Sequence, residues 1–171
     1  GVRKRDLKPG ILAKLENIHD YPELDPYPSK THTNSGEAGL LSYVTVKEIL
    51  GDLDEPEESS DIDQQKYSKA KFMGKHCQGQ IEVDLNGIAP TIRSEHHGNI
   101  EFRRLSKENG GAYFDELSEG KKERRLTIRE CARIQSFPDN YQFIRPGRDG
   151  VSATSAYKMI GNAVPPLMAF H

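Results

Sequence analysis

Residues 125–141 read RLTIRECARIQSFPDNY and carry the clearest structural signal of the chain. Thr127 and Glu130 have the spacing of a capping box, in which each residue of the pair binds a backbone amide of the other. Apolar side chains then recur at helical spacing, and Phe137-Pro138 ends the pattern because proline cannot donate a helical hydrogen bond. We therefore predict a helix after Thr127 with a mostly apolar face and with Cys131 in the core.

Downstream, residues 157–166 read YKMIGNAVPP. Residues 156–160 are typical of a short helix or an extended lead-in. Gly161-Asn162 predicts a turn. Pro165-Pro166 predicts the start of a final helix, since proline is favoured at the first helical position.

Upstream, residues 71–117 predict small twisted β-structure. Polar and apolar residues alternate there, which is the pattern of a half-buried strand. The expected strands are residues 80–85, 88–92, 100–105 and 112–117. Asn86-Gly87 between the first two is a strong hairpin signal.

The first third of the chain predicts mostly loops. Residues 8–43 are rich in X-Pro pairs, which favour extended backbone, apart from a possible short helix near residues 11–18. Thr45 and Glu48 form a second capping-box pair, and Gly51 can supply a left-handed C-terminal turn. The acidic residues 52–63 are typical of a mobile loop.

Composition narrows the class of protein. A chain of 171 residues makes one domain, or one domain and a small appendage. No apolar run approaches the ~20 residues of a membrane helix, no leader is visible, and two cysteines make no disulfide framework. We therefore expect a cytoplasmic protein without membrane partners. Residues 1–64 hold 7 Lys and Arg against 14 Asp and Glu, whereas residues 65–171 hold 17 against 12. The basic second part is suited to a polyanion, or is only a solvated surface.

The two quoted stretches resemble motifs IX and X of DNA cytosine-5 methyltransferases, in that order. Residues 1–7 are similar to the segment after motif VIII of that family, and residues 87–92 are similar to its Thr-Leu/Ile landmark. The resemblance implies the C-terminal part of such an enzyme. Residues 1–123 would be the target recognition domain with a connecting segment, and residues 124–171 the motif IX helix and motif X. The implied fold is α+β, with small antiparallel sheets, short helices and long loops. Its C-terminal helices would return to a doubly wound catalytic domain.

Three family motifs are absent from the chain: the Gly-rich cofactor loop, the Pro-Cys nucleophile and Glu-Asn-Val. Cys77 follows His76 rather than a proline, and it lies downstream of the motif VIII-like start. We therefore expect no catalytic residue here and no activity of the chain alone. The partner would be a missing N-terminal catalytic domain or a separate catalytic subunit.

The resemblance also implies a set of residues that bind double-stranded DNA. Gln78 would enter the space left by the flipped cytosine, and Arg93 and Glu95 would contact guanine and cytosine edges. The full set is Lys75, Gln78, Thr91, Arg93, Glu95, His96, Arg103 and Arg104, the last two as phosphate contacts. The alternatives are an ordinary glycine-rich loop, a surface ion pair and a solvated basic face. A metal site at the histidines is not expected, because their spacing fits no zinc pattern.

In the same way, Asn162, Ala163 and Val164 would close part of an S-adenosylmethionine pocket. The implied function is sequence-specific DNA recognition in a methyltransferase of a prokaryotic restriction-modification system. The methyl group would pass from S-adenosylmethionine to C5 of a flipped cytosine. The alternative from another class is a DNA-binding subunit or module with no enzyme role of its own.

Overall fold

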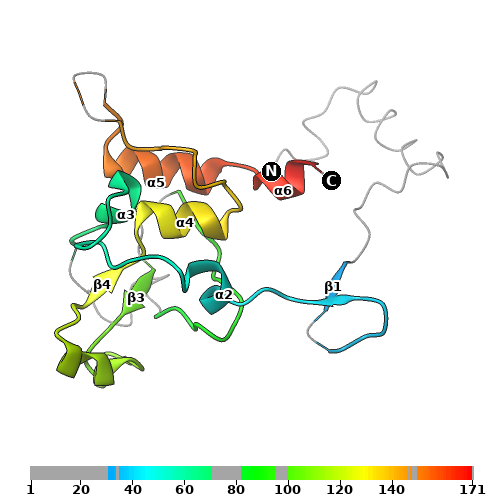
Figure 1. The fold of residues 1–171 in the computed structure, drawn as a ribbon, viewed down its shortest axis with the longest axis horizontal. Helices are drawn as coiled ribbons and strands as arrows, with labels where there is room; N and C mark the ends of the chain where they lie inside the picture. Colours follow the sequence, from blue (N-terminus) through cyan, green and yellow to red (C-terminus); the bar gives the residue numbers. More distant parts are fainter. Residues whose placement is uncertain are drawn as a thin grey trace, which may run out of the picture. The chain divides into compact units, whose positions relative to one another are not determined.

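The computed structural model describes residues 31–33, 35–70, 82–94, 100–145, 147 and 150–170 (Figure 1). The chain divides into two units, residues 1–42 and residues 43–171. In the first unit, strands β1 (His32–Thr33) and β2 (Leu41–Ser42) pair in parallel. Positive φ angles of 69° at Gly36 and 86° at Gly39 turn the chain between these strands. The expectation of loop in this segment, and of only antiparallel sheets, is therefore wrong here.

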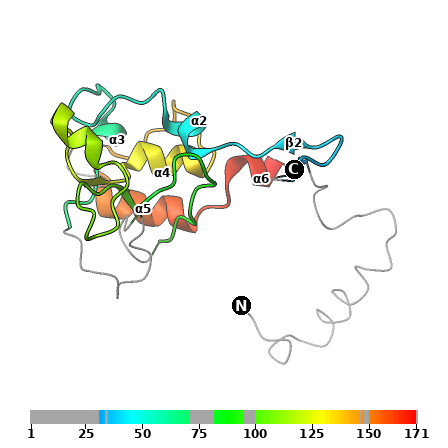
Figure 2. The same cartoon turned by 90° about the horizontal axis from the view of Figure 1, so that it is seen from below.

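The second unit is built around helix α4 (Ile128–Ile134). It packs against α2 (Val46–Leu50), α3 (Ile62–Gln65) and α5 (Ala153–Asn162) (Figure 1). In the view of Figure 2, α4 lies between α5 and the other two helices. The predicted capping box is confirmed: the Thr127 side chain accepts from Glu130 N, and the Glu130 side chain accepts from Thr127 N. Residues 128–132 are all buried, so α4 is enclosed on every side rather than amphipathic.

The core of this unit gathers apolar side chains from several segments between Val46 and Ile160. Cys131 is 1% exposed, which confirms its predicted place in the core. Helix α2 also carries its predicted capping box, between Thr45 and Glu48. Gly51 ends α2 at φ −68°, however, so the predicted left-handed turn is absent there.

Strands β3 (Glu101–Arg103) and β4 (Arg124–Arg125) form an antiparallel pair, with Glu101 opposite Arg125. β3 confirms the centre of the strand predicted at residues 100–105. Residues 114–119, expected partly as a strand, form the 3-10 helix η3 (Phe114–Glu119). Gly120, at φ 75°, ends that helix.

The hairpin predicted across Asn86-Gly87 does not form. The turn itself is present, with Gly87 N donating to Asp84 O. Residue 82 pairs instead with Glu101, and Val83 N donates to Glu101 O. The carbonyls of Gly87 and Leu85 accept from Val46 N and Lys47 N. These amides open α2 and have no partner within that helix, so the helix end takes the bonds that a second strand would need.

The C-terminal region is more helical than predicted. α5 begins after Ser152, whose side chain accepts from Ser155 N, and it continues through Gly161 and Asn162 instead of turning there. The predicted last helix is present as α6 (Pro166–Phe170). In the described ranges, no helix has both the length and the apolar character needed to cross a membrane.

Candidate functional site

Glu130 joins the start of α4 to the strand before it. Its carboxylate accepts from Thr127 N at 2.8 Å and takes two hydrogen bonds, of 2.9 Å each, from the Arg124 guanidinium. Glu130 is 1% exposed and Arg124 is 5% exposed, so this two-bond pairing is shielded from water. Burial lowers the pKa of Arg124, but the charge of Glu130 and the bonds to it raise that pKa above its ordinary value.

Residues 52–63 are predicted as a mobile loop, but three of their carboxylates, those of Glu55, Asp61 and Asp63, pair with buried arginines. Glu55 binds Arg103 at 2.6 Å and Arg124 at 3.1 Å. Arg129 binds Asp61 at 2.5 Å and Asp63 at 3.3 Å. Much of the positive charge of the second half of the chain is therefore neutralised within the fold.

Asp63 is the most enclosed of these carboxylates, at 0% exposure. Its two oxygens accept from Phe143 N and Ile144 N, each at 2.8 Å. Arg129 completes the arrangement by donating to Tyr141 O at 2.9 Å. Asp63 thus fixes the segment that follows α4, and no local sequence pattern signalled this role.

Arg133, near the end of α4, is more exposed than Arg129, the other paired arginine of the helix. It binds Asp139 at 2.7 Å, binds Asp52, and donates to Ile49 O at 3.0 Å. Arg129 and Arg133 therefore both hold neighbouring segments to α4.

Two of the predicted phosphate contacts are buried. Arg103 is 1% exposed, and its guanidinium also binds Glu116 at 2.5 Å and Lys122 O at 2.9 Å. Arg104 is 5% exposed and donates to Asn109 O at 2.8 Å. Neither guanidinium is presented to solvent, so the geometry corrects the expectation that these arginines reach DNA phosphates.

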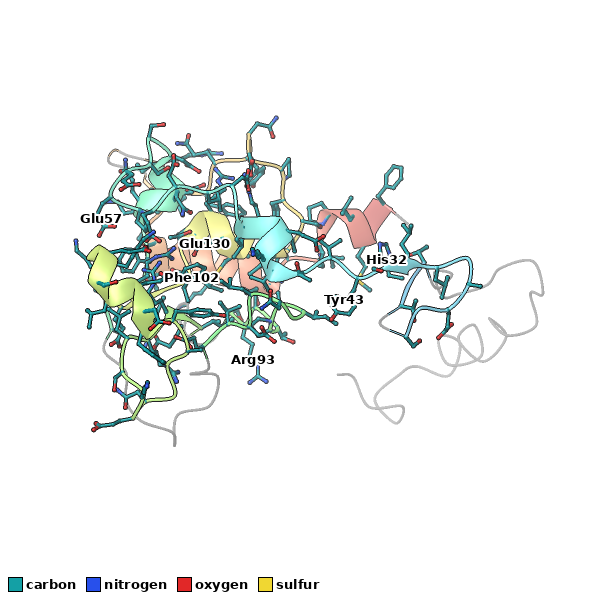
Figure 3. All side chains as sticks on the ribbon, turned by 60° about the horizontal axis from the view of Figure 1, so that its bottom comes forward. His32, Tyr43, Glu57, Arg93, Phe102 and Glu130 are labelled. Atoms are coloured by element: carbon teal, nitrogen blue, oxygen red, sulfur yellow. The ribbon has the colours of Figure 1, made fainter. Side chains whose placement is uncertain are left out.

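Thr91 and Arg93, by contrast, are exposed. Between them, Ile92 is 6% exposed and belongs to the core, so it anchors the segment. Figure 3 shows the Arg93 side chain extending away from the ribbon. The other predicted DNA contacts, Lys75, Gln78, Glu95 and His96, lie outside the described residues.

The predicted cofactor residues lie where α5 ends. Asn162 is the last residue of the helix, and Ala163 is extended, with its N–H bonded to Ile160 O at 3.2 Å. Asn162 and Val164 are exposed and Ala163 is half-buried. An amide and an apolar side chain are therefore open to a ligand on this side.

Two residues at the end of α4 hold the segment that contains these three. Gln135 Nε2 donates to Ile160 O at 3.5 Å, and Ser136 Oγ accepts from Leu167 N at 3.1 Å. Ser136 has φ 62°, a left-handed conformation that is uncommon outside glycine. The bonds of Gln135 and Ser136 fix the backbone on both sides of Asn162, Ala163 and Val164.

Gly161 brings the two predicted sites together. A Cβ placed on this glycine would contact the backbone of Arg93 and Ser94, at 2.5 Å from Arg93 C and 2.8 Å from Arg93 O. The exposed segment of Thr91 and Arg93 is therefore next to the end of α5 that carries Asn162.

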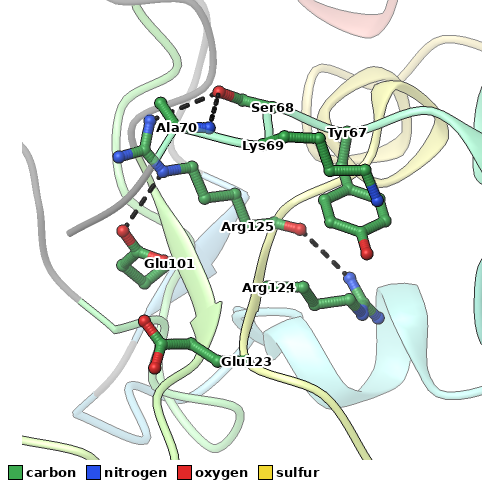
Figure 4. A pocket seen from close by; sticks show the side chains of 8 residues that line it. All are labelled: Tyr67, Ser68, Lys69, Ala70, Glu101, Glu123, Arg124 and Arg125. Atoms are coloured by element: carbon green, nitrogen blue, oxygen red, sulfur yellow. Dashed lines mark hydrogen bonds and ion pairs between the residues drawn. The ribbon is translucent and has the colours of Figure 1, made fainter.

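A pocket of about 180 Å³ lies beside β3 and β4, lined by Tyr67, Ser68, Glu101, Glu123 and Arg125 among others (Figure 4). Arg125 binds Glu101 at 3.2 Å and Ser68 Oγ at 3.4 Å. Burial raises the pKa of Glu101 above its ordinary value, against the opposing charges of Arg125 and Arg104. The buried charges of this pocket are paired with one another, so we assign them a structural role rather than ligand binding.

Neither a reactive thiol nor a metal centre is found among the residues that the structure describes. Burial, with a contribution from Glu130, raises the pKa of the Cys131 thiol far above its ordinary value. A thiol of this kind is inert, since the thiolate is the reactive form. No group of three His, Cys, Asp or Glu side chains in the described ranges is arranged to hold a metal ion. Cys77 lies outside those ranges.

The chain belongs to the C-5 cytosine-specific DNA methylase family, because the model of that family matches residues 2–171.

The relatives are named as methyltransferases. Type II methyltransferase M.BspRI of Lysinibacillus sphaericus is 31% identical over 178 residues, covering 98% of this chain and 38% of that protein. Type II methyltransferase M.NgoPII of Neisseria gonorrhoeae is 48% identical over 99 residues, covering 57% of this chain and 21% of that protein. DNA (cytosine-5)-methyltransferase 1B of Oryza sativa subsp. japonica is 52% identical over 48 residues, or 28% of this chain and 3% of that protein.

The chain spans less than two fifths of the length of the curated relatives M.BspRI, M.BsuRI and M.NgoFVII. No solved structure gives a significant match.

Proposed function

We propose that this chain is the target-recognition and cofactor-closing part of a DNA (cytosine-5-)-methyltransferase of a type II restriction-modification system. The observation that carries the proposal is the contact at Gly161, which sets the exposed Arg93 segment beside the exposed Asn162 end of α5. A methyltransferase needs base recognition and cofactor contact within reach of one flipped base. A module that only binds DNA does not need the cofactor contact.

Recognition of double-stranded DNA would depend on the exposed side chains. Arg93 is fixed at its backbone by the buried Ile92 and has an exposed side chain, which suits a bidentate bond to guanine O6 and N7. Thr91 would contact the sugar-phosphate backbone from the same segment. Lys75, Gln78, Glu95 and His96 complete the proposed set, whereas Arg103 and Arg104 are left out because of their burial.

S-adenosylmethionine would be held on one side by Asn162, Ala163 and Val164. The exposed amide of Asn162 can bond a polar group of the ligand, and exposed Val164 offers an apolar wall, so these residues fit one side of such a pocket. The bound cofactor would supply the methyl group. The residues of this chain would orient it and exclude water, while the cysteine and glutamate of the reaction come from outside the chain.

The catalytic part would pack on the apolar side chains that follow motif X. Val164, Leu167, Met168 and Phe170 are between 63% and 85% exposed. An exposed apolar group of this kind usually marks an interface. Its partner in the proposal is the remaining polypeptide of the same enzyme or a separate catalytic subunit, acting on DNA in the cytoplasm.

Transfer of labelled methyl groups from S-adenosylmethionine to mixed-sequence DNA tests the function. We expect no transfer by this chain alone and transfer when a polypeptide with the Pro-Cys and Glu-Asn-Val motifs of the same enzyme is added. Arg93→Ala should then lower discrimination at one base pair by ~1–3 kcal/mol. Transfer by the chain alone would contradict the proposal and point to Cys77. DNA binding with no transfer in either case would favour a DNA-binding module.

A further inference from the structure

Gly161 lies in the last turn of α5, with buried Ile160 on one side and exposed Asn162 on the other. Its missing side chain faces backbone atoms, not a flexible side chain: the nearest neighbours of a Cβ there are Ser94 N, Arg93 C and Arg93 O. The backbone of Arg93 and Ser94 lies so close to the helix at Gly161 that no room is left for a methyl group.

Helix formation does not require a glycine here. Gly161 has no positive φ, so an alanine could adopt the same backbone conformation. Glycine in a helix is about 0.8–1.0 kcal/mol less favourable than alanine. The close approach of the Arg93–Ser94 backbone is the physical reason for a glycine at this position.

We propose that Gly161 is a specificity-positioning residue: it sets how deeply the Arg93–Ser94 backbone docks on α5, and thereby where the Arg93 guanidinium meets a base. This inference rests on the proposed function, because it assumes that Arg93 contacts DNA. It adds that sequence recognition depends on a residue of the cofactor-side helix that touches no base.

The size of the expected displacement follows from the contact. Moving Arg93 C from 2.5 Å to the 3.4 Å of ordinary van der Waals contact requires a shift of about 0.9 Å. Hydrogen bonds to base edges are held within a few tenths of an ångström of 2.9 Å. A shift of this size would break a two-bond contact with guanine, while phosphate contacts made by long side chains elsewhere would survive.

The decisive variant is Gly161→Ala, with Thr154→Ala as its matched control. Thr154 is exposed on the same helix, so both substitutions introduce a residue that favours the helix. Only the new methyl group at position 161 contacts the Arg93–Ser94 backbone. The first readout is NMR of the ¹⁵N-labelled chain. In the wild type, a nuclear Overhauser contact should join Gly161 Hα to the Ser94 amide. The Arg93 and Ser94 amide signals should shift in Gly161→Ala and stay in place in Thr154→Ala.

The second readout is selection from a pool of DNA duplexes with a randomised centre. Gly161→Ala should lose preference by at least fivefold at the same base pair as Arg93→Ala, with total affinity for the pool changed less than threefold. The double variant should be no worse than Arg93→Ala alone, because both changes remove one contact. Thr154→Ala should keep the wild-type preference.

Several outcomes would overturn the inference. These are an absent Gly161–Ser94 contact in the wild type, unchanged amide signals in Gly161→Ala, or an unchanged base preference. Loss of preference at a base pair other than that of Arg93 would also do so. If Gly161→Ala does not fold, the wild-type NMR contact still tests whether Gly161 lies against Ser94. The Arg93→Ala selection still tests whether Arg93 reads a base pair. A wild-type chain that binds no duplex even with the Pro-Cys and Glu-Asn-Val polypeptide present would contradict the proposed function. The NMR measurement separates that result from a failure of the contact between Gly161 and Ser94.

Discussion

Removal of the Asp63 side chain should destabilise the fold more than any other acidic substitution in residues 52–63. Asp63 is 0% exposed, and its oxygens accept from Phe143 N and Ile144 N at 2.8 Å and lie 3.3 Å from Arg129 Nη2. In Asp63→Ala both amides would lose their acceptor in a place that water does not reach, since Phe143 is 2% and Ile144 is 7% exposed.

The magnitude follows from these contacts. Hydrogen bonds to a charged group contribute about 1.5–3 kcal/mol each, so the two amides together account for about 3–6 kcal/mol. Arg129 keeps Asp61 at 2.5 Å and is not left without a carboxylate. We therefore expect Asp63→Ala to lower the free energy of unfolding by about 3–5 kcal/mol. Asp63→Asn, which keeps one acceptor oxygen, should cost about 2–3 kcal/mol.

Urea unfolding followed by circular dichroism measures these values, since the chain has no tryptophan for fluorescence. Asp54→Ala is the matched control, because Asp54 is an exposed residue of the same acidic segment and its loss should change stability by less than about 0.5 kcal/mol. If Asp63→Ala costs no more than Asp54→Ala, the buried carboxylate does not hold the segment and the reasoning is refuted.

Three further predictions follow from buried groups. Cys131 should resist a thiol reagent in the native chain and react only on unfolding, because burial raises the pKa of its thiol; rapid native labelling of Cys131, resolved by peptide mapping, would contradict this. Tyr157→Phe should cost about 1–2 kcal/mol in urea unfolding, because the Tyr157 hydroxyl donates to buried Leu126 O at 2.5 Å and nothing replaces it; an unchanged midpoint would count against that bond. Burial would raise the pKa of Glu55, but the hydrogen bond from Arg103 and the charges of Arg124 and Arg103 hold that pKa below its ordinary value. Its stabilisation should thus be present above about pH 4.5 and be lost as pH falls through the lower folded value, so Glu55→Gln should flatten the acid side of a stability–pH profile, and an equally steep profile would refute this.

Sequence alone predicted those elements whose signals are local. Both capping boxes, at Thr45 and Thr127, formed as expected, because the bonding groups lie three residues apart on one helix end. The strand centred on Phe102 and the proline-led α6 were predictable for the same reason.

The failures arose where a distant partner changed a local preference. Asn86-Gly87 made its turn, but the carbonyls of Leu85 and Gly87 accept from amides of α2, and Val83 N donates to a carbonyl of β3. No window around residue 86 contains these partners. Arg103 appeared as a free cation in the sequence because its partner Glu55 lies 48 residues away. Gly161-Asn162 continued a helix, and the contacts around it come from distant segments: Gln135 bonds to Ile160 O, and the Arg93–Ser94 backbone lies against Gly161.

For the candidate site, the sequence indicated the exposed residues Thr91, Arg93 and Asn162, and their role in DNA and cofactor binding stays a prediction. The charge imbalance between the two parts of the chain favoured a basic surface, and the structure shows why this inference was too simple. Asp61 and Asp63 bind Arg129, and Glu55 binds Arg103, so an excess counted along the chain is not an excess on the surface.

The carboxylates of residues 52–63 act as counter-ions that are covalently tethered to the arginines they neutralise. A free counter-ion exchanges with the ions of a resin, whereas these are held by the peptide chain and by a fold that keeps Arg103, Arg124 and Arg129 at 5% exposure or less. Arg103, Arg124 and Arg129 will therefore contribute little to retention on a cation exchanger. Exposed side chains such as Lys66, Lys69 and Arg93 will decide the salt at which the protein elutes.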